Sequence, residues 1–359
     1  MNDMTGPDNE LMLERKGYLG IIRLNRPRAL NSLNVNMVHH MREALATFAD
    51  DPEIASVIVA GEGGRAFCAG GDIRIIHDLG KANDPDVSRF WREEFPLNYT
   101  IAHYPKPYIA LLDGIVMGGG VGLSAHGAFR VVTETTRLAM PETGIGYFPD
   151  VGVSWLLPKA PGEIGTWMGL TGNEVNAADA IFAGLADVHV PAERLEELTT
   201  AISALDPSHV HKGIEMLLAQ FSTPPAPGMF ETGRELVDAV FSHDTVEEII
   251  ATLKAKADAF SQTTLQTLQK RSPTSLKITL RMLRLARESS GLIECLEREF
   301  AAGLEVLKGH DFYEGVRAAI IDKDRNPQWQ PAMLSDVADE DVARYFGQNP
   351  HPVFASHRL

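Results

Sequence analysis

Several features common in other protein classes are scarce in this chain of 359 residues. It has two cysteines, Cys68 and Cys295, too few for a framework of disulfides, and neither lies in a spacing typical of zinc sites. No stretch reaches the roughly 18 to 20 uninterrupted apolar residues of a membrane span. The start, "MNDMTGPDNELMLERKG", is polar and has no apolar signal region. We therefore expect no metal, no membrane and a reducing, cytoplasmic setting.

Basic residues are in deficit. Lys and Arg number 33 against 48 Asp and Glu, which leaves a formal net charge of -15. Nucleic-acid binding needs a basic face for phosphates, so the charge argues against that class of partner. A small anionic ligand needs only a local group of Arg or Lys and is not excluded. The 44% of hydrophobic residues suffice for a buried core, and the length favours more than one compact unit.

Strand and helix patterns alternate over the first half of the chain. "YLGIIRLNRP", "IASVIVAGEG" and "KPYIALLDGIVM" are typical of strands, and "NSLNVNMVHHMREALATFADD" has helical spacing after an Asn/Ser start. This alternation predicts an α/β fold with crossover connections for residues 11–195. We expect a flexible tail before it, residues 1–10, and a mostly helical C-terminal region after it, residues 196–359.

Two glycine-rich turns each follow an apolar strand. "MGGGVG" leads into an expected apolar helix, "LSAHGAF", and "FCAGGD" follows another strand. Glycine lets the backbone come close to a ligand, and N–H groups at a helix start can bind an anion or an oxyanion. Either turn could equally be a tight connection without a ligand. The pattern does not fit a dinucleotide fingerprint, a P-loop or a serine-hydrolase elbow.

The segment Leu138–Val153, "LAMPETGIGYFPDVGV", holds two carboxylates in an otherwise apolar stretch. Taken alone, Glu142 follows a proline and could be an acid in the first turn of a helix. Asp150 follows Pro149 and could be a turn or cap residue. Two such acids could instead carry out acid–base or nucleophilic chemistry, and the residues alone leave both readings open.

"RAFCAGGDI", "KPYIALLDGIVMGGGVGLS" and "RLAMPETGIGYFPDVGVS" occur in this order, and together they resemble the enoyl-CoA hydratase/isomerase (crotonase) superfamily. The resemblance implies a spiral of ββα units and coenzyme A thioester substrates. It also implies an oxyanion hole of two backbone N–H groups, which fall on Gly71 and Gly119. Gly118 and Gly120 would contact the substrate, and Arg28 in "RPRAL" is the nearest candidate cation for coenzyme A.

One position departs from the hydratases of this superfamily, which generally use one glutamate just after the glycine triplet and another in the later "PE". The second is Glu142, but the first falls on Gly122, which cannot act as an acid or base. The combination "MPETGIGYFPDVG" resembles the 3-hydroxyisobutyryl-CoA hydrolase subgroup instead, as do "FWREEFPLN", "RSPTSLKIT" and "DFYEGVRAAIIDKDRNPQW". That subgroup implies catalytic roles for Glu142 and Asp150 and a substrate contact for Glu94. Taken alone, Glu94 could be a solvated acid.

The resemblance thus predicts hydrolysis of 3-hydroxyisobutyryl-CoA in valine breakdown, with no cofactor, because coenzyme A is part of the substrate. A hydratase or isomerase of the same fold and a non-catalytic acyl-CoA-binding protein remain alternatives. If Glu142 and Asp150 are buried together, we expect a coupled titration with one pKa raised. Members of the superfamily often trimerise through C-terminal helices, so a homo-oligomer is one expectation, and a helical region covering its own active site is the other. The charged run "ECLEREF" is expected to be a solvated face.

Overall fold

The computed structural model describes residues 10–347, 349 and 351–356, so residues 1–9 of the expected tail lie outside the described residues. The chain forms two compact units, and each is assembled from separated stretches of sequence. The first unit holds the described residues up to Gly71, Pro96–Leu138 and Glu174–Gly228, and the second holds Asp72–Phe95, Ala139–Asn173 and the described residues from Met229 onward. The division near residue 195, which follows from a change in sequence pattern, stays a prediction.

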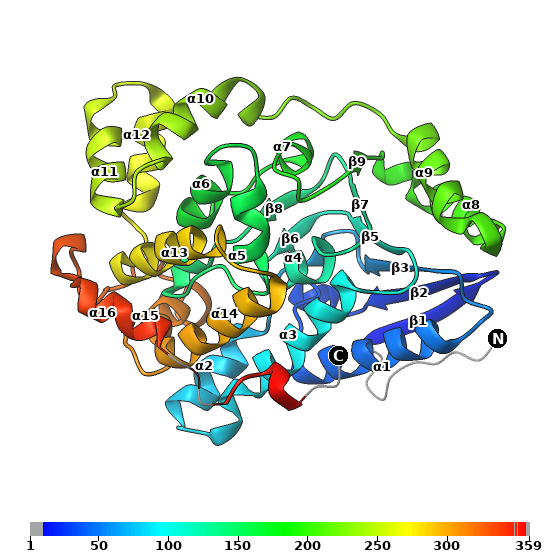
Figure 1. Ribbon diagram of the computed structural model, residues 1–359, viewed down its shortest axis with the longest axis horizontal. Helices are drawn as coiled ribbons and strands as arrows, with labels where there is room; N and C mark the ends of the chain where they lie inside the picture. Colours follow the sequence, from blue (N-terminus) through cyan, green and yellow to red (C-terminus); the bar gives the residue numbers. More distant parts are fainter. Residues whose placement is uncertain (1–9, 348, 350, 357–359) are drawn as a thin grey trace. The chain divides into compact units, whose positions relative to one another are not determined.

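The first unit is built on a six-stranded sheet in the order β1-β2-β3-β5-β7-β9 (Figure 1). β1 and β2 pair antiparallel, and the remaining pairs are parallel. Parallel neighbours need crossover connections, which is what the alternating sequence pattern predicts. The strands are β1 (Leu11–Lys16), β2 (Leu19–Leu24), β3 (Ser56–Gly61), β5 (Tyr108–Leu112), β7 (Phe129–Val132) and β9 (Val188–His189).

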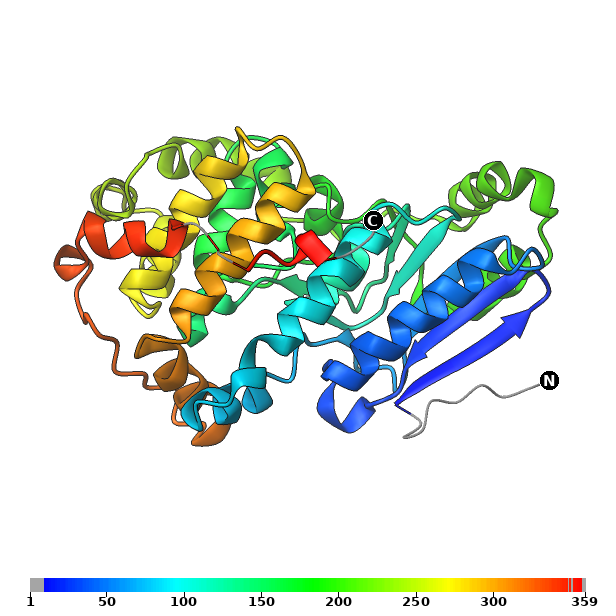
Figure 2. The ribbon, with the colours of Figure 1, turned by 60° about the horizontal axis from the view of Figure 1, so that its bottom comes forward.

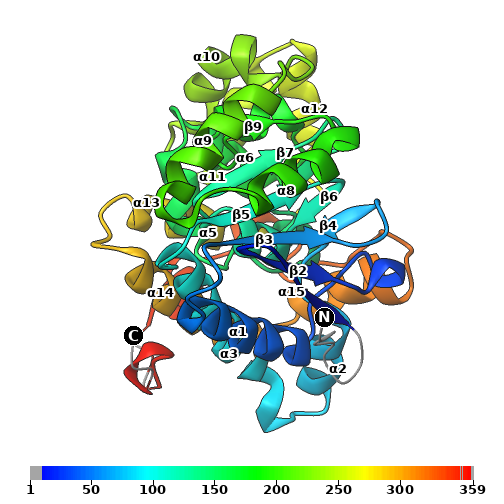
Figure 3. The same cartoon turned by 90° about the vertical axis from the view of Figure 1, so that its right-hand side faces the viewer.

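Apolar side chains from these strands pack under two helices that lie over the sheet (Figure 3). Ile58, Ile109 and Val131 from the sheet meet Leu198 of α8 and Leu218 of α9, and all five are buried. On β1 and β2 lies α1, seen beside them in Figure 2. The helices of this unit are α1 (Val35–Asp50), α4 (Gly119–Ser124), α7 (Ala177–Phe182), α8 (Leu195–Ser203) and α9 (Val210–Phe221), with short turns η1 (Pro27–Ala29), η5 (Ala192–Arg194) and η6 (Pro207–His209).

A second, three-stranded sheet has the order β4-β6-β8, with β4 at Ala66–Cys68, β6 at Ile115–Met117 and β8 at Arg137–Ala139. The expected helix "LSAHGAF" is wrong in position, because α4 starts within the glycines and ends at Ser124. Glycine is a poor helix former, but tertiary packing of this short turn overrides its low propensity.

Helix α3 (Arg89–Ala102) has residues in both units, and the division falls at Pro96 inside the helix. The helix runs through Pro96 without a break, as the cyan ribbon in Figure 2 shows. A proline within a helix removes one main-chain hydrogen bond, so this is the point at which the helix is locally weakest.

The second unit is mainly helical. Its central helices α5, α6, α13 and α14 contact one another, with α13 touching both α5 and α6 and α14 touching α5. Its elements are α2 (Ile73–Lys81), η2 (Pro85–Ser88), η3 (Glu142–Ile145), α5 (Val153–Leu156), η4 (Leu157–Lys159), α6 (Ile164–Thr171), α10 (Phe230–Phe241), α11 (Val246–Ala255), α12 (Ala259–Leu268), α13 (Pro273–Ala286), α14 (Leu292–Val306), α15 (Asp311–Val316), η7 (Arg317–Ile321), η8 (Leu334–Asp336), α16 (Asp339–Ala343), η9 (Arg344–Phe346) and η10 (Phe354–Ser356). Within the described part of the chain, no helix has both the length and the apolar character needed to cross a membrane.

Candidate functional site

In the first unit the two glycine-rich turns lie against each other. They follow β4 and β6, which are parallel neighbours, so both turns leave the same edge of the small sheet. Gly70 has a φ of 101°, and a β-carbon placed on it would lie 3.5 Å from the main-chain nitrogen of Gly119. The turn that carries Gly71 is therefore packed directly against the start of α4.

The main chain of α4 leaves its first N–H group available. Gly119 is the first residue of the helix, so no carbonyl lies four residues before it within the helix. The N–H groups of Val121 and Gly122 both donate to the Gly118 carbonyl, at 2.8 and 3.2 Å. A β-carbon on Gly120 would lie 2.2 Å from the Cys68 carbonyl oxygen, so only glycine fits at this position. The glycine triplet thus allows the backbone of α4 to pack closely against the backbone at Cys68.

The loop that contains Arg28 is ordered by its own main chain and by one buried amide. Asn31 accepts a hydrogen bond from the Arg26 N–H at 2.9 Å and donates to the carbonyls of Glu62 and Ala66. The loop continues into Leu33, whose N–H donates to the Gly70 carbonyl at 2.8 Å. Arg28 itself lies in η1 with an exposed side chain. Its contact with coenzyme A stays a prediction.

Four carboxylates are buried as one cluster in the second unit. Their exposed fractions are 1% for Glu94, 7% for Glu142, 6% for Asp150 and 0% for Glu299. They come from α3, the start of η3, the residue before a tight turn, and α14. Oε1 of Glu94 and Oε2 of Glu142 have no hydrogen-bond partner among the described residues. The reading of Glu94 as a solvated acid is therefore wrong.

The electrostatics of the cluster are those of acids kept away from water. Burial is the largest cause of a raised pKa for all four groups. The Asp150 charge further raises the pKa of Glu142, of Glu94 and of Glu299, whose pKa rises to about 8. Burial raises the pKa of Asp150 to about 7, while the nearby polar groups of Tyr147 and Trp91 hold it lower than burial alone would. The pKa of both Glu142 and Asp150 is raised, and the Asp150 charge contributes to the shift of Glu142. Their titration as a coupled pair stays a prediction.

Aromatic rings surround these carboxylates. Trp91 and Tyr147 stack with ring centres 5.8 Å apart and planes 7° from parallel, and Phe312 meets Tyr147 edge-on at 6.0 Å. Phe95 and Phe300 form a second edge-to-face pair at 6.4 Å. Rings of this kind contribute much apolar surface and few hydrogen bonds, which is the physical reason that burial dominates the pKa shifts.

The family described as enoyl-CoA hydratase/isomerase matches residues 19–346. The chain belongs to this family. A curated relative, the mitochondrial 3-hydroxyisobutyryl-CoA hydrolase of Xenopus tropicalis, is 43% identical over 350 residues, covering 96% of this chain and 91% of the relative. The human mitochondrial enzyme of the same name is also 43% identical, covering 96% and 90%. A solved structure of a carnitinyl-CoA dehydratase from Mycobacterium thermoresistibile is 39% identical, with a TM-score of 0.90 and coverage of 97% of this chain and 99% of that one.

The structural match confirms the predicted α/β fold of the crotonase type. The expected cytoplasmic setting is contradicted, because the named hydrolase relatives are mitochondrial proteins. That expectation rested on the polar N-terminal stretch. Such a stretch excludes an apolar secretory signal, but other targeting segments are polar, so it says little about the compartment.

Sequence reasoning missed Glu299. The run "ECLEREF" was expected to be a solvated face, and for Glu299 this is wrong, since its side chain is fully buried. A signal was present: in α14, Glu299 follows Cys295 and Leu296 by four and three residues, so it lies on the buried apolar stripe of the helix. An acid in the middle of such a stripe is either paired or functional, because an isolated buried charge is costly.

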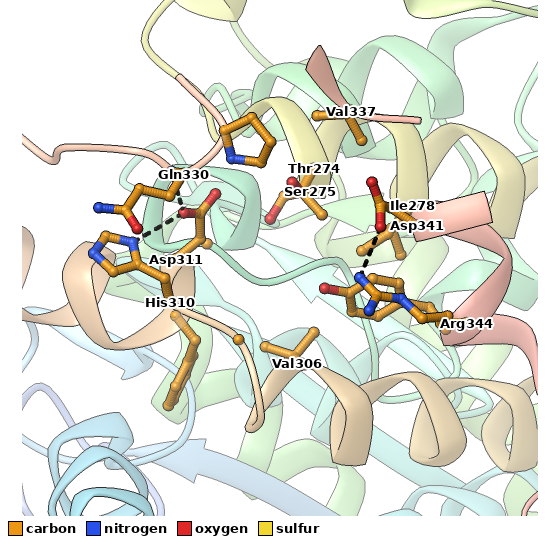
Figure 4. Close-up of a pocket in the computed structure, with 15 residues that line it drawn as sticks. Thr274, Ser275, Ile278, Val306, His310, Asp311, Gln330, Val337, Asp341 and Arg344 are labelled. Carbon is orange, nitrogen blue, oxygen red and sulfur yellow. Dashed lines mark hydrogen bonds and ion pairs between the residues drawn. The ribbon is translucent and has the colours of Figure 1, made fainter. Parts of the chain in front are cut away.

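A cavity of about 280 Å³ also lies in this unit (Figure 4). Asp311 is tied down beside it by the hydroxyl of Ser272 at 2.6 Å and the N–H of Gln330 at 2.8 Å. Across the cavity Arg344 pairs with Asp341 at 3.0 Å. None of the catalytic, oxyanion or substrate residues expected from the sequence lines it. Among the described residues, no group of three or more His, Cys, Asp or Glu has an arrangement that could hold a metal ion.

Proposed function

We propose that this chain hydrolyses a short 3-hydroxyacyl-CoA thioester, converting 3-hydroxyisobutyryl-CoA and water into 3-hydroxyisobutyrate and coenzyme A. The observation that carries the proposal is the buried, electrostatically coupled pair Glu142 and Asp150, together with Gly122 in place of a second glutamate. Relatives with 43% identity over most of the chain are named for this reaction. The reaction would be a step in valine breakdown.

Glu142 is proposed as the group that attacks. It could take a proton from water as the water adds to the thioester carbonyl, or it could add to the carbonyl itself and form a mixed anhydride that water then opens. Both routes need the ionised carboxylate. Because burial and the Asp150 charge raise the pKa of Glu142, its carboxylate is more basic than an exposed one. Attack on the carbonyl carbon breaks its bond to sulfur when the tetrahedral intermediate collapses.

The negative charge that develops on the carbonyl oxygen needs hydrogen-bond donors. We assign this task to the main-chain N–H groups of Gly71 and Gly119, which belong to the two turns packed together in the first unit. Gly118 and Gly120 would border the thioester. Rigid main-chain donors cost little reorganisation during the reaction, which is why such positions suit glycine-rich turns.

Asp150 is proposed to move the remaining proton. A group with a pKa of about 7 can both give and take a proton near neutral pH, and the departing sulfur of coenzyme A needs one. Glu94 is proposed to accept a hydrogen bond from the 3-hydroxyl of the substrate, and Arg28 to pair with a phosphate of coenzyme A. The scheme draws only on acid–base and main-chain groups of the protein, so it needs no cofactor.

A second candidate is addition or removal of water at a double bond, since one solved relative is named a dehydratase. Against it stands Gly122, a buried glycine within α4 at the place where the family's hydratases generally have an acid. A third candidate is acyl-CoA binding without turnover. Four buried carboxylates are costly to keep, and a pure binding protein would gain nothing from them.

One assay separates the three candidates. The protein is incubated with 3-hydroxyisobutyryl-CoA, 3-hydroxypropionyl-CoA or crotonyl-CoA, while free thiol and enoyl absorbance are followed. We expect thiol release from the two hydroxyacyl substrates, and a loss of at least ~10²-fold in Glu142→Gln and Glu142→Ala. Loss of enoyl absorbance without thiol release favours the hydratase, and binding without either signal favours the third candidate. Thiol release that survives in Glu142→Ala contradicts the role given to Glu142.

A further inference from the structure

The backbone just after Asp150 has an unusual conformation. Val151 has a φ of 54° and Gly152 a φ of 75°, so two consecutive residues are left-handed. For glycine this is ordinary, but for a β-branched residue it is a genuine outlier. Such a conformation persists only when the surrounding structure holds it, and it often marks a place where function dictates the backbone.

Glu299 supplies that hold from a helix 147 residues away along the chain from Gly152. One carboxylate oxygen, Oε2, accepts the N–H of Gly152 at 2.8 Å. The other, Oε1, accepts the N–H of Ser154 at 3.2 Å and the Ser154 hydroxyl. Both oxygens of Glu299 are therefore used as acceptors for donors of the turn. The side chain has no exposed surface.

We infer that Glu299 is a positioning residue for Asp150: it fixes the turn that sets the place of the Asp150 carboxylate, and so the surroundings in which Asp150 gives up its proton. The consequence for catalysis rests on the proposed function. The consequence for the titration of Asp150 does not, and it can be measured without any substrate.

The order in which the two acids release their protons follows from their pKa values. The Asp150 charge raises the pKa of Glu299 to about 8, above the value of about 7 for Asp150, so Glu299 releases its proton after Asp150 does. The hydrogen bonds from Gly152 and Ser154 lower the pKa of Glu299 and so favour its charge. The titratable groups of this neighbourhood are Glu94 of α3, Glu142 of η3, Tyr147, and Glu299 with Cys295 of α14. The charged neighbours that act on the four carboxyl pKa values are all acids, so they reinforce one another.

Three variants test how the turn is held. Glu299→Gln keeps the size of the side chain but replaces one acceptor oxygen with an NH2 group. Glu299→Asp keeps the carboxyl group but withdraws it from the turn by one methylene. Ser154→Ala removes one hydrogen bond and leaves the carboxylate in place. Glu305→Gln is the matched control, since Glu305 lies on the same helix and pairs only with Lys308 among the described ion pairs.

The first measurement is the titration of Asp150, followed by carbon-13 NMR of aspartate carboxyl groups in labelled protein. The Asp150 signal is assigned by its loss in Asp150→Asn. We expect the Asp150 midpoint to fall by about one pH unit or more in Glu299→Gln, because the turn loses an acceptor, water can reach the Asp150 carboxyl, and the burial that raises its pKa is weakened. It should fall less in Ser154→Ala and stay in place in Glu305→Gln.

The second measurement is thioester hydrolysis. We expect kcat to fall by about 10- to 100-fold in Glu299→Gln and Glu299→Asp, with KM changed by less than about threefold, because a small displacement of a reacting group costs rate rather than binding. In Glu299→Gln, the inflection of the pH profile that Asp150→Asn removes should move to lower pH.

An Asp150 midpoint that is the same in Glu299→Gln as in the native protein overturns the inferred effect on titration, and an unchanged kcat in both Glu299 variants overturns the inferred effect on catalysis. If circular dichroism shows that Glu299→Gln does not fold, Ser154→Ala decides, and native kcat and native titration in that variant overturn the inference. If the native protein releases no thiol, the proposed function fails, while the NMR titration still tests Glu299.

Discussion

Gly303 and the hydroxyl group of Tyr147 are in direct contact: a β-carbon on Gly303 would lie 2.7 Å from the Tyr147 oxygen. Gly303 follows Glu299 by four residues on α14, so both lie on the same helix face. The ring of Tyr147 is held between Trp91 and Phe312 and has little room to withdraw. The absence of a side chain at Gly303 therefore leaves room for the Tyr147 hydroxyl, which lowers the pKa of Asp150.

We expect Gly303→Ala to push Tyr147 away from Asp150. Displacement of the Tyr147 hydroxyl should raise the pKa of Asp150 above its value of about 7, and overpacking should cost about 1–3 kcal/mol of unfolding free energy. Urea unfolding and the Asp150 titration measure the two effects. Gly233→Ala is the control, because Gly233 lies in α10 with nothing within 4 Å of an added β-carbon, and it should stabilise by about 0.5–1 kcal/mol. A Gly303→Ala protein as stable as the native one contradicts the prediction.

Glu94→Gln should change which substrates are preferred. If Glu94 accepts the hydrogen bond of the 3-hydroxyl, the variant should lose about 10-fold or more in kcat/KM for 3-hydroxyisobutyryl-CoA and little for isobutyryl-CoA, which has no hydroxyl. The measurement is thiol release from the two thioesters side by side. Equal losses for both substrates would assign Glu94 a general role in the cluster instead of recognition of the hydroxyl.

The stability of the protein should fall as pH rises from mildly acidic to mildly alkaline values. In the folded chain the pKa of Asp150 is raised from 3.8 to about 7 and that of Glu299 from 4.5 to about 8. The native state therefore binds more protons than the unfolded state in this window. The stabilisation from these protons is complete below the unfolded pKa values and is lost as the pH rises through the folded pKa values. We expect a loss on the order of several kcal/mol between about pH 5 and pH 8.

The double variant Asp150→Asn with Glu299→Gln should show a flatter dependence, because two of the groups that release protons are gone. Urea unfolding at several pH values measures the slope for both proteins. A native protein whose stability rises over this window, or a double variant with an unchanged slope, contradicts the assignment of buried, protonated acids.

Gly120→Ala tests the glycine turns of the first unit. The added β-carbon would lie 2.2 Å from the Cys68 carbonyl oxygen, and main-chain atoms of a strand cannot move aside cheaply. We expect a loss of at least about 2–4 kcal/mol in unfolding free energy, or no soluble protein. Gly64→Ala is a useful contrast, since it has open space but a φ of 64°, so only backbone strain remains, with an expected cost of about 1–2 kcal/mol. If both variants unfold at the same urea concentration, the packing argument for Gly120 fails.

The elements that were predicted correctly are those with local signals. Asn34 caps α1 by accepting the Met37 N–H at 2.8 Å, as the Asn/Ser start of that stretch indicates. β1 was not predicted, because Glu14 and Arg15 are exposed and only Leu11 is fully buried, so its pattern is that of an edge strand with a weak apolar face.

The site divides in the same way. Glu142 and Asp150 stand in a recognisable motif, and both prove to be buried in one coupled cluster. Glu299 belongs to no motif, and its hydrogen bonds to Gly152 and Ser154 exist only after folding brings α14 to that turn. The charged neighbours of Glu299 in the sequence indicate an exposed face, which is wrong for this residue. Its position on the apolar stripe of the helix could have been recognised from the sequence.

Each compact unit is interleaved with the other along the chain, and this has a consequence for synthesis and for dissection of the protein. The second unit consists of three separate segments of the sequence, and the last of them begins at Met229. A ribosome must therefore make about three quarters of the chain before α13, which begins at Pro273, and then α14 can start to enclose Glu142 and Asp150. A fragment that stops at residue 195 would contain both acids of the motif but not Glu299, and their aromatic and helical surroundings would be incomplete.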